Sequence, residues 1–204
     1  MNKKQLMAKY GEEKIFAVPY SKVEFIPDGF TPLKHDVRIW GQFDSMGEFI
    51  YRYDAEGQPY MQQIIPYILI LDESGQKVFT TKRVAGDSRL VNKVSIACGG
   101  HIDKCDEGRE VLFKAAVREL FEEVQADILK PLEIIGYVRD LASSTSDHTG
   151  VVILAHATGD VEVKEKDNLI GEWMDLNQLI ANYENLEGWS KYIVDHFAKN
   201  KKIY

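Results

Sequence analysis

Short runs of hydrophobic residues, separated by turn residues, predict where the strands of this chain lie. Runs that are rich in β-branched and aromatic side chains and bounded by turn residues are typical of strands. The runs that meet this description cover residues 14–20, 37–43, 48–53, 63–71, 77–83, 94–98, 134–139, 151–157 and 168–174. The turn Asp72-Glu73-Ser74-Gly75 joins two of these runs and predicts a β-hairpin.

A different period marks the helices of the chain. Between residues 109 and 126, apolar side chains recur every three or four positions, as in an amphipathic helix. Its predicted apolar face consists of Phe113, Val117, Leu120, Phe121 and Val124. Asp175 and Gln178 have the spacing of a capping box and predict a helix start, and a last helix is predicted over residues 186–199. Because strands and helices interleave, we expect an α/β fold with a mixed sheet covered by helices.

The first 60 residues differ from the rest, because glycine and proline are scattered through them. Their short aromatic and β-branched runs predict a β-rich N-terminal elaboration, packed on the main body or swapped with that of a partner chain. Residues 61–204 carry the stronger periodic patterns and are expected to form the main domain. The sequence leaves open whether the chain forms a homodimer.

Composition and charge exclude several classes of protein. The chain has 204 residues, of which 45% are hydrophobic and 28% charged, with a net charge of −7. These proportions are ordinary for a globular protein with a sizeable core. The acidic balance argues against stable nucleic-acid binding. Because the longest apolar run (64–71) is too short to cross a bilayer and the N-terminus does not resemble a signal peptide, we expect no membrane partner and a cytoplasmic location.

Three carboxylates on the predicted central helix form the strongest candidate site. Glu119, Glu122 and Glu123 are three and four positions apart, so their side chains share one sector of the helix. Like charges at this spacing destabilise a helix, and a hard divalent cation such as Mg²⁺ or Mn²⁺ would offset that cost. Ala115 and Ala116, one turn earlier, would leave room there for a diphosphate. The alternative is a solvated glutamate stripe on an amphipathic helix.

The residues around the carboxylates favour a site over a solvated stripe. The strand predicted over residues 94–98 runs directly into Gly99-Gly100, which suggests a sharp turn with close backbone approach. Arg118 is placed to hydrogen-bond the neighbouring acids.

These residues resemble the box of the Nudix (MutT-like) hydrolase family. That box runs Gly, five residues, Glu, seven residues, Arg-Glu-apolar-any-Glu-Glu-any-Gly-apolar. Glu110, seven residues, and then Arg118-Glu119-Leu120-Phe121-Glu122-Glu123 match its second half. Two departures stand out: Gln125 replaces the box glycine, and nine residues rather than five separate Gly100 from Glu110. The four extra residues are expected within 104–109, and Glu107 competes with Glu110 for the first acidic position.

The resemblance implies an αβα sandwich and hydrolysis of a diphosphate linkage in a nucleoside-diphosphate-type small molecule, with Mg²⁺ or Mn²⁺. It implies that Glu119, Glu122 and Glu123 bind the metal and act in catalysis. Arg118 would act with them and, together with Glu110, hold the loop and helix in place, while the Gly99-Gly100 turn would contact substrate. The first 60 residues are vaguely similar to a branch of the family described as predicted phosphoesterases.

Three residues outside the box are weaker candidates for the site. Glu172, at a strand end, is a candidate metal ligand or general base, although an exposed acid is its simpler interpretation. His148, beside Asp147 in a loop, is a candidate for catalysis or substrate contact, although a solvated loop histidine is common. Arg83 is a candidate phosphate ligand, with a surface ion pair as its alternative.

Two other functions compete with a diphosphate hydrolase. The first is a non-catalytic nucleotide-binding or regulatory module on the same fold, because a fold does not by itself establish an activity. The second is isomerisation of a diphosphate isoprenoid, which needs a catalytic cysteine. Cys98 is expected to be a buried apolar residue and Cys105 a solvated loop thiol, so neither suits that role.

Overall fold

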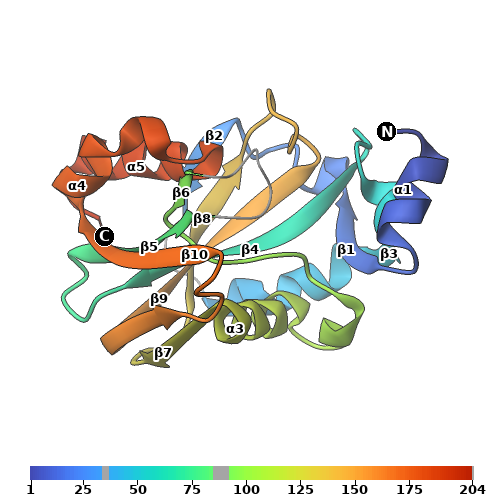
Figure 1. Cartoon of the computed structure of the whole chain (residues 1–204). Coiled ribbons are helices and arrows are strands. Elements are labelled where there is room, and N and C mark those ends of the chain that lie inside the picture. The colour runs from blue at the N-terminus through green and yellow to red at the C-terminus, as the bar shows by residue number, and fades with distance from the viewer. Residues whose placement is uncertain (34–36, 85–91, 204) are drawn as a thin grey trace.

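The computed structural model describes residues 1–33, 37–84 and 92–203, and for residues 37–40 it describes the backbone only. In this part of the chain, ten strands form one mixed sheet, whose main path runs β10-β5-β4-β9-β8-β2 (Figure 1). The strands of this path are β2 (Gly29–Pro32), β4 (Met61–Leu71), β5 (Lys77–Arg83), β8 (Glu133–Arg139), β9 (His148–Val163) and β10 (Leu169–Asp175). β4 and β9 run parallel, and the other pairs of the path are antiparallel. The expected α/β fold is confirmed.

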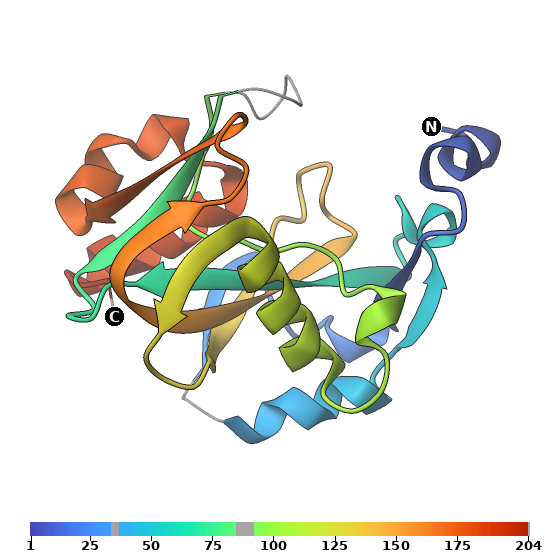
Figure 2. The same cartoon turned by 60° about the horizontal axis from the view of Figure 1, so that its bottom comes forward.

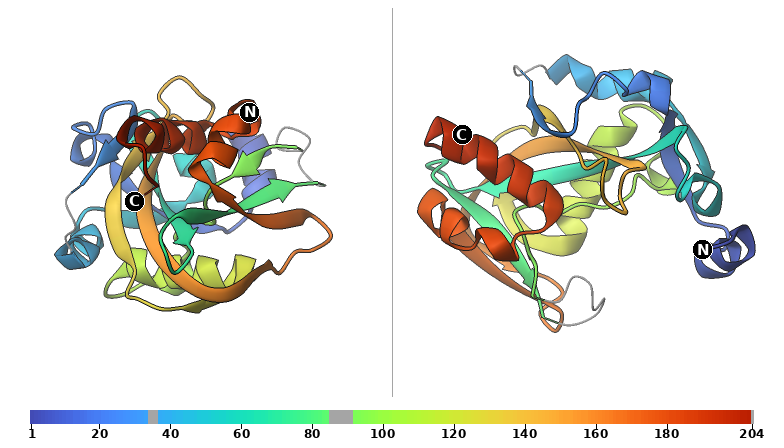
Figure 3. Two further views of the ribbon diagram at one scale, coloured as in Figure 1. Left: turned by 90° about the vertical axis from the view of Figure 1, so that its left-hand side faces the viewer. Right: turned by 90° about the horizontal axis from the view of Figure 1, so that it is seen from above.

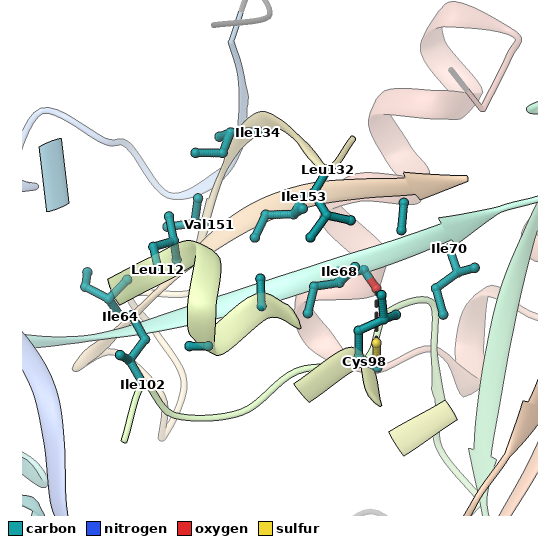
Figure 4. Close-up of a cluster of buried hydrophobic side chains, with 14 of the residues drawn as sticks. Ile64, Ile68, Ile70, Cys98, Ile102, Leu112, Leu132, Ile134, Val151 and Ile153 are labelled. Carbon is teal, nitrogen blue, oxygen red and sulfur yellow. Dashed lines mark hydrogen bonds between the residues drawn. The ribbon is translucent and has the colours of Figure 1, made fainter. Parts of the chain in front are cut away.

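Helices cover both faces of the sheet, as Figures 1 and 3 show. Helix α3 (Val111–Glu123) lies on one face, and helices α4 (Leu176–Ala181) and α5 (Gly188–Asn200) lie on the other. Alternate residues of β4 pack into the two core layers, one on each face of the sheet. Ile64, Ile68 and Ile70 pack in the α3 layer, which Figure 4 shows, and Tyr67, Leu69 and Leu71 pack toward α4 and α5. This two-residue period makes β4 buried on both faces.

The N-terminal segment adds strands to the same sheet. β1 (Lys14–Pro19) pairs with β4 and with β3 (Glu48–Tyr51), and β2 pairs with β8. Around them lie α1 (Lys3–Tyr10), α2 (Arg52–Ala55) and the 3₁₀ helix η1 (Tyr20–Lys22). In this chain, β1 and β2 of the segment pair with β4 and β8 of the main body. Exchange with a partner chain and a domain boundary at residue 60 stay predictions.

The strand predicted over residues 37–43 is wrong, because the backbone there forms the 3₁₀ helix η2 (Val37–Ser45). Apolar residues recur in this sequence at every third position, which suits a helix of three residues per turn. Phe43 is buried in the core. Asp44, next to it, accepts hydrogen bonds from the backbone N–H groups of Glu110 and Val111, at 2.7 and 3.0 Å. The N-terminal segment thus caps helix α3.

Helix α3 is shorter than predicted, and only part of its predicted apolar face is buried. Leu120 and Val124 are buried as predicted. The helix ends at Glu123, because Val124 begins β7 (Val124–Ile128), which pairs with the far end of β9. Phe121, assigned to the apolar face, is 58% exposed, whereas Ala115 and Ala116 are fully buried. Their small methyl groups allow the helix to approach the sheet closely, so the core fills the space that we expected above the carboxylates.

The remaining elements differ from expectation mainly at their ends. β6 is limited to Val94–Ser95, and Cys98 makes an isolated bridge to Ile68 of β4. Asp175 and Gln178 form the predicted capping box of α4. The 3₁₀ helices η3 (Lys104–Asp106) and η4 (Tyr183–Asn185) complete the described chain. Within residues 1–33, 37–84 and 92–203, each helix is too short or too polar to cross a bilayer.

Candidate active site

Arg118 is the hub of the hydrogen bonds at the C-terminal half of α3. Its Nε and Nη2 donate to the two carboxylate oxygens of Asp106, at 3.2 and 2.8 Å, and Nη2 also donates to the carbonyl of His101 at 2.8 Å. Its Nη1 donates to Glu119 at 2.6 Å and to Glu122 at 3.2 Å. The fork of the guanidinium therefore ties the loop after Gly100 to the acidic face of the helix.

The partner of Arg118 is Asp106, which the sequence analysis missed, and not Glu110. Asp106 is 4% exposed, whereas Glu110 is exposed and has the positive φ angle of 58°. Five residues separate Gly100 from Asp106, which is the first interval of the box. The four extra residues are therefore Glu107–Glu110, placed after the first acid and not before it. The five-residue interval to Asp106 was present in the sequence. Because the box has a glutamate at this position, Glu107 and Glu110 were preferred over an aspartate.

Two of the three box carboxylates pack against the Gly99-Gly100 turn. A Cβ atom on Gly100 would lie 2.7 Å from a carboxylate oxygen of Glu119, so a larger residue there would displace the end of that side chain. Gly99 has a φ angle of 149°, and its N–H donates to Glu123 at 3.0 Å. Burial raises the pKa of Glu119, and burial raises that of Glu123 to about 7. Glu122 is more exposed than the other two.

A cavity of about 600 Å³ opens beside this turn. Glu123, both glycines, and Arg83 at the end of β5 line one side of it. The cavity continues toward α5, where Tyr67 and Trp189 pack edge to face at a centroid distance of 5.4 Å. Its volume lies within the usual range for small-molecule sites. The room for a ligand that we placed above Ala115 and Ala116 is found here instead.

His148 also lines this cavity and ends a chain of hydrogen bonds that begins at His101. His101 Nε2 lies 2.8 Å from Gln63 Oε1, and Gln63 Nε2 donates to Asp147 Oδ2 at 3.1 Å. The backbone N–H of Gly57 donates to the same Oδ2 at 2.6 Å. Asp147 Oδ1 lies 2.8 Å from Nδ1 of His148. The N-terminal segment, through Gly57, thus helps to hold Asp147 and the adjacent His148, which is the first residue of β9 and not a loop residue as expected.

The order of donors and acceptors along this chain defines the tautomer of His148. A carboxylate only accepts hydrogen bonds, so Asp147 takes one from Gln63 Nε2 and one from His148 Nδ1. In the neutral ring, Nε2 of His148 is then left as an acceptor. Burial alone would raise the pKa of Asp147, but the hydrogen bonds that its carboxylate accepts from His148 and from the Gly57 N–H outweigh burial and lower that pKa. Burial, with Arg52 adding to it, lowers the pKa of His101 to about 3, so that ring is neutral.

The other predicted residues are placed differently. Glu172 is exposed on β10 and is not among the described residues that line the 600 Å³ cavity. Cys98 is buried with its thiol directed at the carbonyl of Ile68, and burial raises its pKa well above the ordinary value. Cys105 is exposed. A reactive thiol is therefore not a feature of this site.

The donors of the acidic face suit a hard cation. Carboxylate oxygens are the ligands that Mg²⁺ and Mn²⁺ prefer, and Glu119, Glu122 and Glu123 supply them within one turn of α3. Arg118 holds one oxygen of Glu119 and one of Glu122. Within the described ranges, no three His, Cys, Asp or Glu side chains are already grouped as a metal-binding cluster. The residue types fit the metal, and binding would require these side chains to move closer together.

Comparison with known proteins defines the class. The family model of the NUDIX domain matches residues 61–197. The chain belongs to this family and is a Nudix-type hydrolase, which confirms the resemblance found in the helix box. It is 34% identical over 169 residues to protein YmaB of Bacillus subtilis (strain 168), a match that covers 77% of this chain and 81% of YmaB.

Solved structures show the same fold. Tm1382, described as a candidate Nudix hydrolase, superimposes with a TM-score of 0.77 at 28% identity, over 92% of this chain and 100% of that one. The match leaves little of the chain out, so it includes most of the first 60 residues. A bifunctional NMN adenylyltransferase/ADP ribose pyrophosphatase from Francisella tularensis, solved with AMP and a manganese ion, gives 0.51 at 14% identity, over 68% of this chain and 42% of that one.

Proposed function

We propose that this protein hydrolyses a diphosphate linkage in a nucleoside-diphosphate-type small molecule, with Mg²⁺ or Mn²⁺ as its cofactor. The observation that carries the proposal is the position of Glu123, which is bonded to the Gly99 turn at the wall of the 600 Å³ cavity. Glu119 and Glu122 stand beside it on α3 and complete the set of carboxylates. A divalent cation, when bound, would neutralise phosphate charge and make the water bound to it more acidic.

The chain's own residues divide the remaining work. Glu119, Glu122 and Glu123 hold the cation, and Arg118 orients two of these carboxylates through Nη1. Arg83, on the same wall of the cavity as Glu123, binds a phosphate oxygen. Gly99 and Gly100 let the substrate approach the backbone closely.

His148 accepts the proton of the attacking water at Nε2. Nδ1 of His148 is hydrogen-bonded to Asp147. His148 and Glu123 both line the 600 Å³ cavity. A proton acceptor placed within reach of the reacting water accelerates such a step by roughly 100-fold or more. Glu172 has no part in this assignment, because it lies outside the described lining of the cavity.

The nucleotide part of the proposal is supported by the cavity and by a structural relative. Tyr67 and Trp189 give the cavity an aromatic wall, as expected for a site that takes a base or another flat group. The Francisella protein was solved with AMP and a manganese ion. A cytoplasmic location, and the absence of nucleic-acid and membrane partners, remain predictions that accompany this proposal.

The test is a panel of nucleotide sugars, ADP-ribose, NADH, coenzyme A, dinucleoside polyphosphates and oxidised nucleoside triphosphates, each incubated with Mg²⁺ or Mn²⁺. Released nucleotide or phosphate, absent in EDTA and in Glu122→Gln, supports the proposal. The second candidate, a non-catalytic nucleotide-binding module, predicts saturable binding of a panel member with no turnover in either metal.

A further inference from the structure

A second, larger cavity lies on the outer side of His148. It is a groove of about 1360 Å³ between the N-terminal segment and the loop that precedes β9. Figure 2 shows α1 and that loop rising from the same side of the sheet. Most of the wall of this groove comes from α1, β3, α2 and the turn before β4. These elements precede residue 61, where the match to the family model begins. We call it the outer groove.

The outer groove and the 600 Å³ cavity meet at one loop. Ser144, Thr145 and His148 line both of them. A molecule whose diphosphate lies beside Glu123 would therefore pass His148 before its far end enters the outer groove. The two volumes stand on either side of the residue to which we assign proton transfer.

The lining of the outer groove contains three acids, Glu48, Asp54 and Glu56, and four cations, Lys3, Lys9, Lys14 and Arg52, in a chain whose net charge is −7. Lys3 is paired with Asp54, and tyrosine rings lie beside the other three cations. The ammonium of Lys14 lies 4.6 Å from the ring centre of Tyr51, and Lys9 and Arg52 lie 4.5 and 4.4 Å from that of Tyr10. A lysine positioned over a ring keeps hydrogens for an anion, so Lys9 and Lys14 suit a phosphate group, whereas Arg52 is already paired with Glu13 and Glu56.

The same groove offers aromatic surface. Tyr60 is 63% exposed at its wall. Tyr51 and Tyr53, which also line the groove, stack on each other at 5.0 Å, with 10° between their planes. Exposed aromatic rings beside cations are the combination by which proteins hold a nucleobase together with its phosphate.

We propose that the outer groove is a second substrate subsite, which takes a nucleoside monophosphate unit. The substrate class is then a two-headed one, in which two aromatic, phosphate-bearing units are joined through their phosphates. Lys14 binds phosphate in the outer groove, and Tyr60 stacks on the base. This inference rests on the proposed function for the bond that is cut, but binding in the groove needs no metal.

The first experiment separates the groove from the carboxylates by using EDTA. Binding of AMP to the full chain is measured by ligand-observed NMR, with adenosine and inorganic phosphate as partial probes. We expect AMP to bind more tightly than either part, and its Kd to rise about tenfold in Lys14→Gln and in Tyr60→Leu. Tyr60→Phe, which keeps the ring, should bind as wild type does. Lys22→Gln, a lysine of the same segment outside the groove, is the matched control.

The proposal is overturned if AMP does not bind in EDTA, or if Lys14→Gln and Tyr60→Leu bind it as well as Lys22→Gln does. Loss of binding in Glu122→Gln alone would also overturn it, because the nucleotide would then lie at the carboxylates. If a second copy of the chain covers the groove instead, light scattering should show a dimer, and Tyr60→Leu should dissociate it. That result also rejects the subsite.

The second experiment uses turnover. For a two-headed substrate such as diadenosine tetraphosphate, KM should rise at least about fivefold more in Lys14→Gln than it does for a one-headed substrate such as ADP-ribose. An equal change for both substrates counts against the subsite. If neither substrate is hydrolysed by the wild type, the proposed function fails for this class, and the EDTA experiment still decides whether the groove binds a nucleotide.

Discussion

Arg118 and Asp106 form a two-pronged ion pair that joins the loop after Gly100 to helix α3. The pair is enclosed, because the two side chains are 19% and 5% exposed. The Arg118 guanidinium also holds the box carboxylates, so the geometry of the candidate metal site depends on a residue outside the helix. Removing one partner of such a pair leaves the other charge without its counterpart in a partly buried place.

We therefore predict that Asp106→Ala lowers the free energy of unfolding by roughly 3 kcal/mol and also lowers kcat. Glu110→Ala, at an exposed position, should change stability by less than about 0.5 kcal/mol. Urea unfolding of both variants measures the difference. If Glu110→Ala is the more damaging change, the assignment of Asp106 as the tether is incorrect.

The box carboxylates should behave in the opposite way. Glu122→Gln and Glu123→Gln are each expected to lower kcat by at least about 100-fold without loss of stability, because a metal ligand is removed and like charges are relieved. Thermal unfolding and steady-state kinetics measure the two effects. Glu172→Gln serves as comparison, and a loss of activity there as large as in Glu122→Gln would return Glu172 to the candidate residues.

Much of the fold could be predicted from the sequence because its signals are local. The apolar run of β4 and the capping box of Asp175 depend on neighbouring residues alone, and both appear in the structure. The two failures have different causes. The buried face of α3 depends on how closely Ala115 and Ala116 approach the sheet, which is a tertiary property. The β-branched and aromatic residues of segment 37–43 predict a strand, but their apolar spacing also suits the 3₁₀ helix that forms.

In the candidate site, too, the local features could be predicted from the sequence and the long-range contacts could not. The spacing of Glu119, Glu122 and Glu123 is a helical property and could be found in the sequence. Asp106 required a choice between two box intervals, and only the bond to Arg118 shows which interval this chain keeps. The hydrogen bond from Gly57 to Asp147 joins residues 90 positions apart, so no local pattern predicts it.

Divalent metal should stabilise the folded chain. Saturating Mg²⁺ or Mn²⁺ at roughly 100 times Kd adds about 2.7 kcal/mol by mass action, which is about 5 to 10 °C in Tm for a chain of this length. The shift should be much smaller in Glu122→Gln. The double variant Glu107→Gln, Glu110→Gln should keep the full shift, because Glu107 pairs with Lys104 and Glu110 is exposed. An equal reduction in both variants would mean that the loop acids also bind the metal.

His101 should make the folded state sensitive to acid. Its pKa is lowered to about 3, chiefly by burial, so below pH 6.5 the unfolded chain binds a proton that the folded chain excludes. The stability linked to His101 is thus present above pH 6.5 and is lost as the pH falls toward 3, by up to about 1.4 kcal/mol per pH unit. His101→Gln should remove this slope. Urea unfolding at pH 7, 6 and 5 compares the two proteins, and parallel losses would show that His101 is not the group that titrates.

Asp147→Asn gives the sharpest test of the role assigned to His148. Gly57 N–H and Gln63 Nε2 both donate to Oδ2, so an asparagine keeps its oxygen there and turns its NH₂ group toward His148 Nδ1. Nδ1 then has to accept, the proton moves to Nε2, and the proton acceptor facing the cavity is lost. We expect kcat to fall by about 100-fold or more with little change in KM or Tm. Nitrogen-15 NMR of His148 should show the exchanged tautomer. If the tautomer changes and kcat does not, His148 Nε2 is not the group that takes the proton from water.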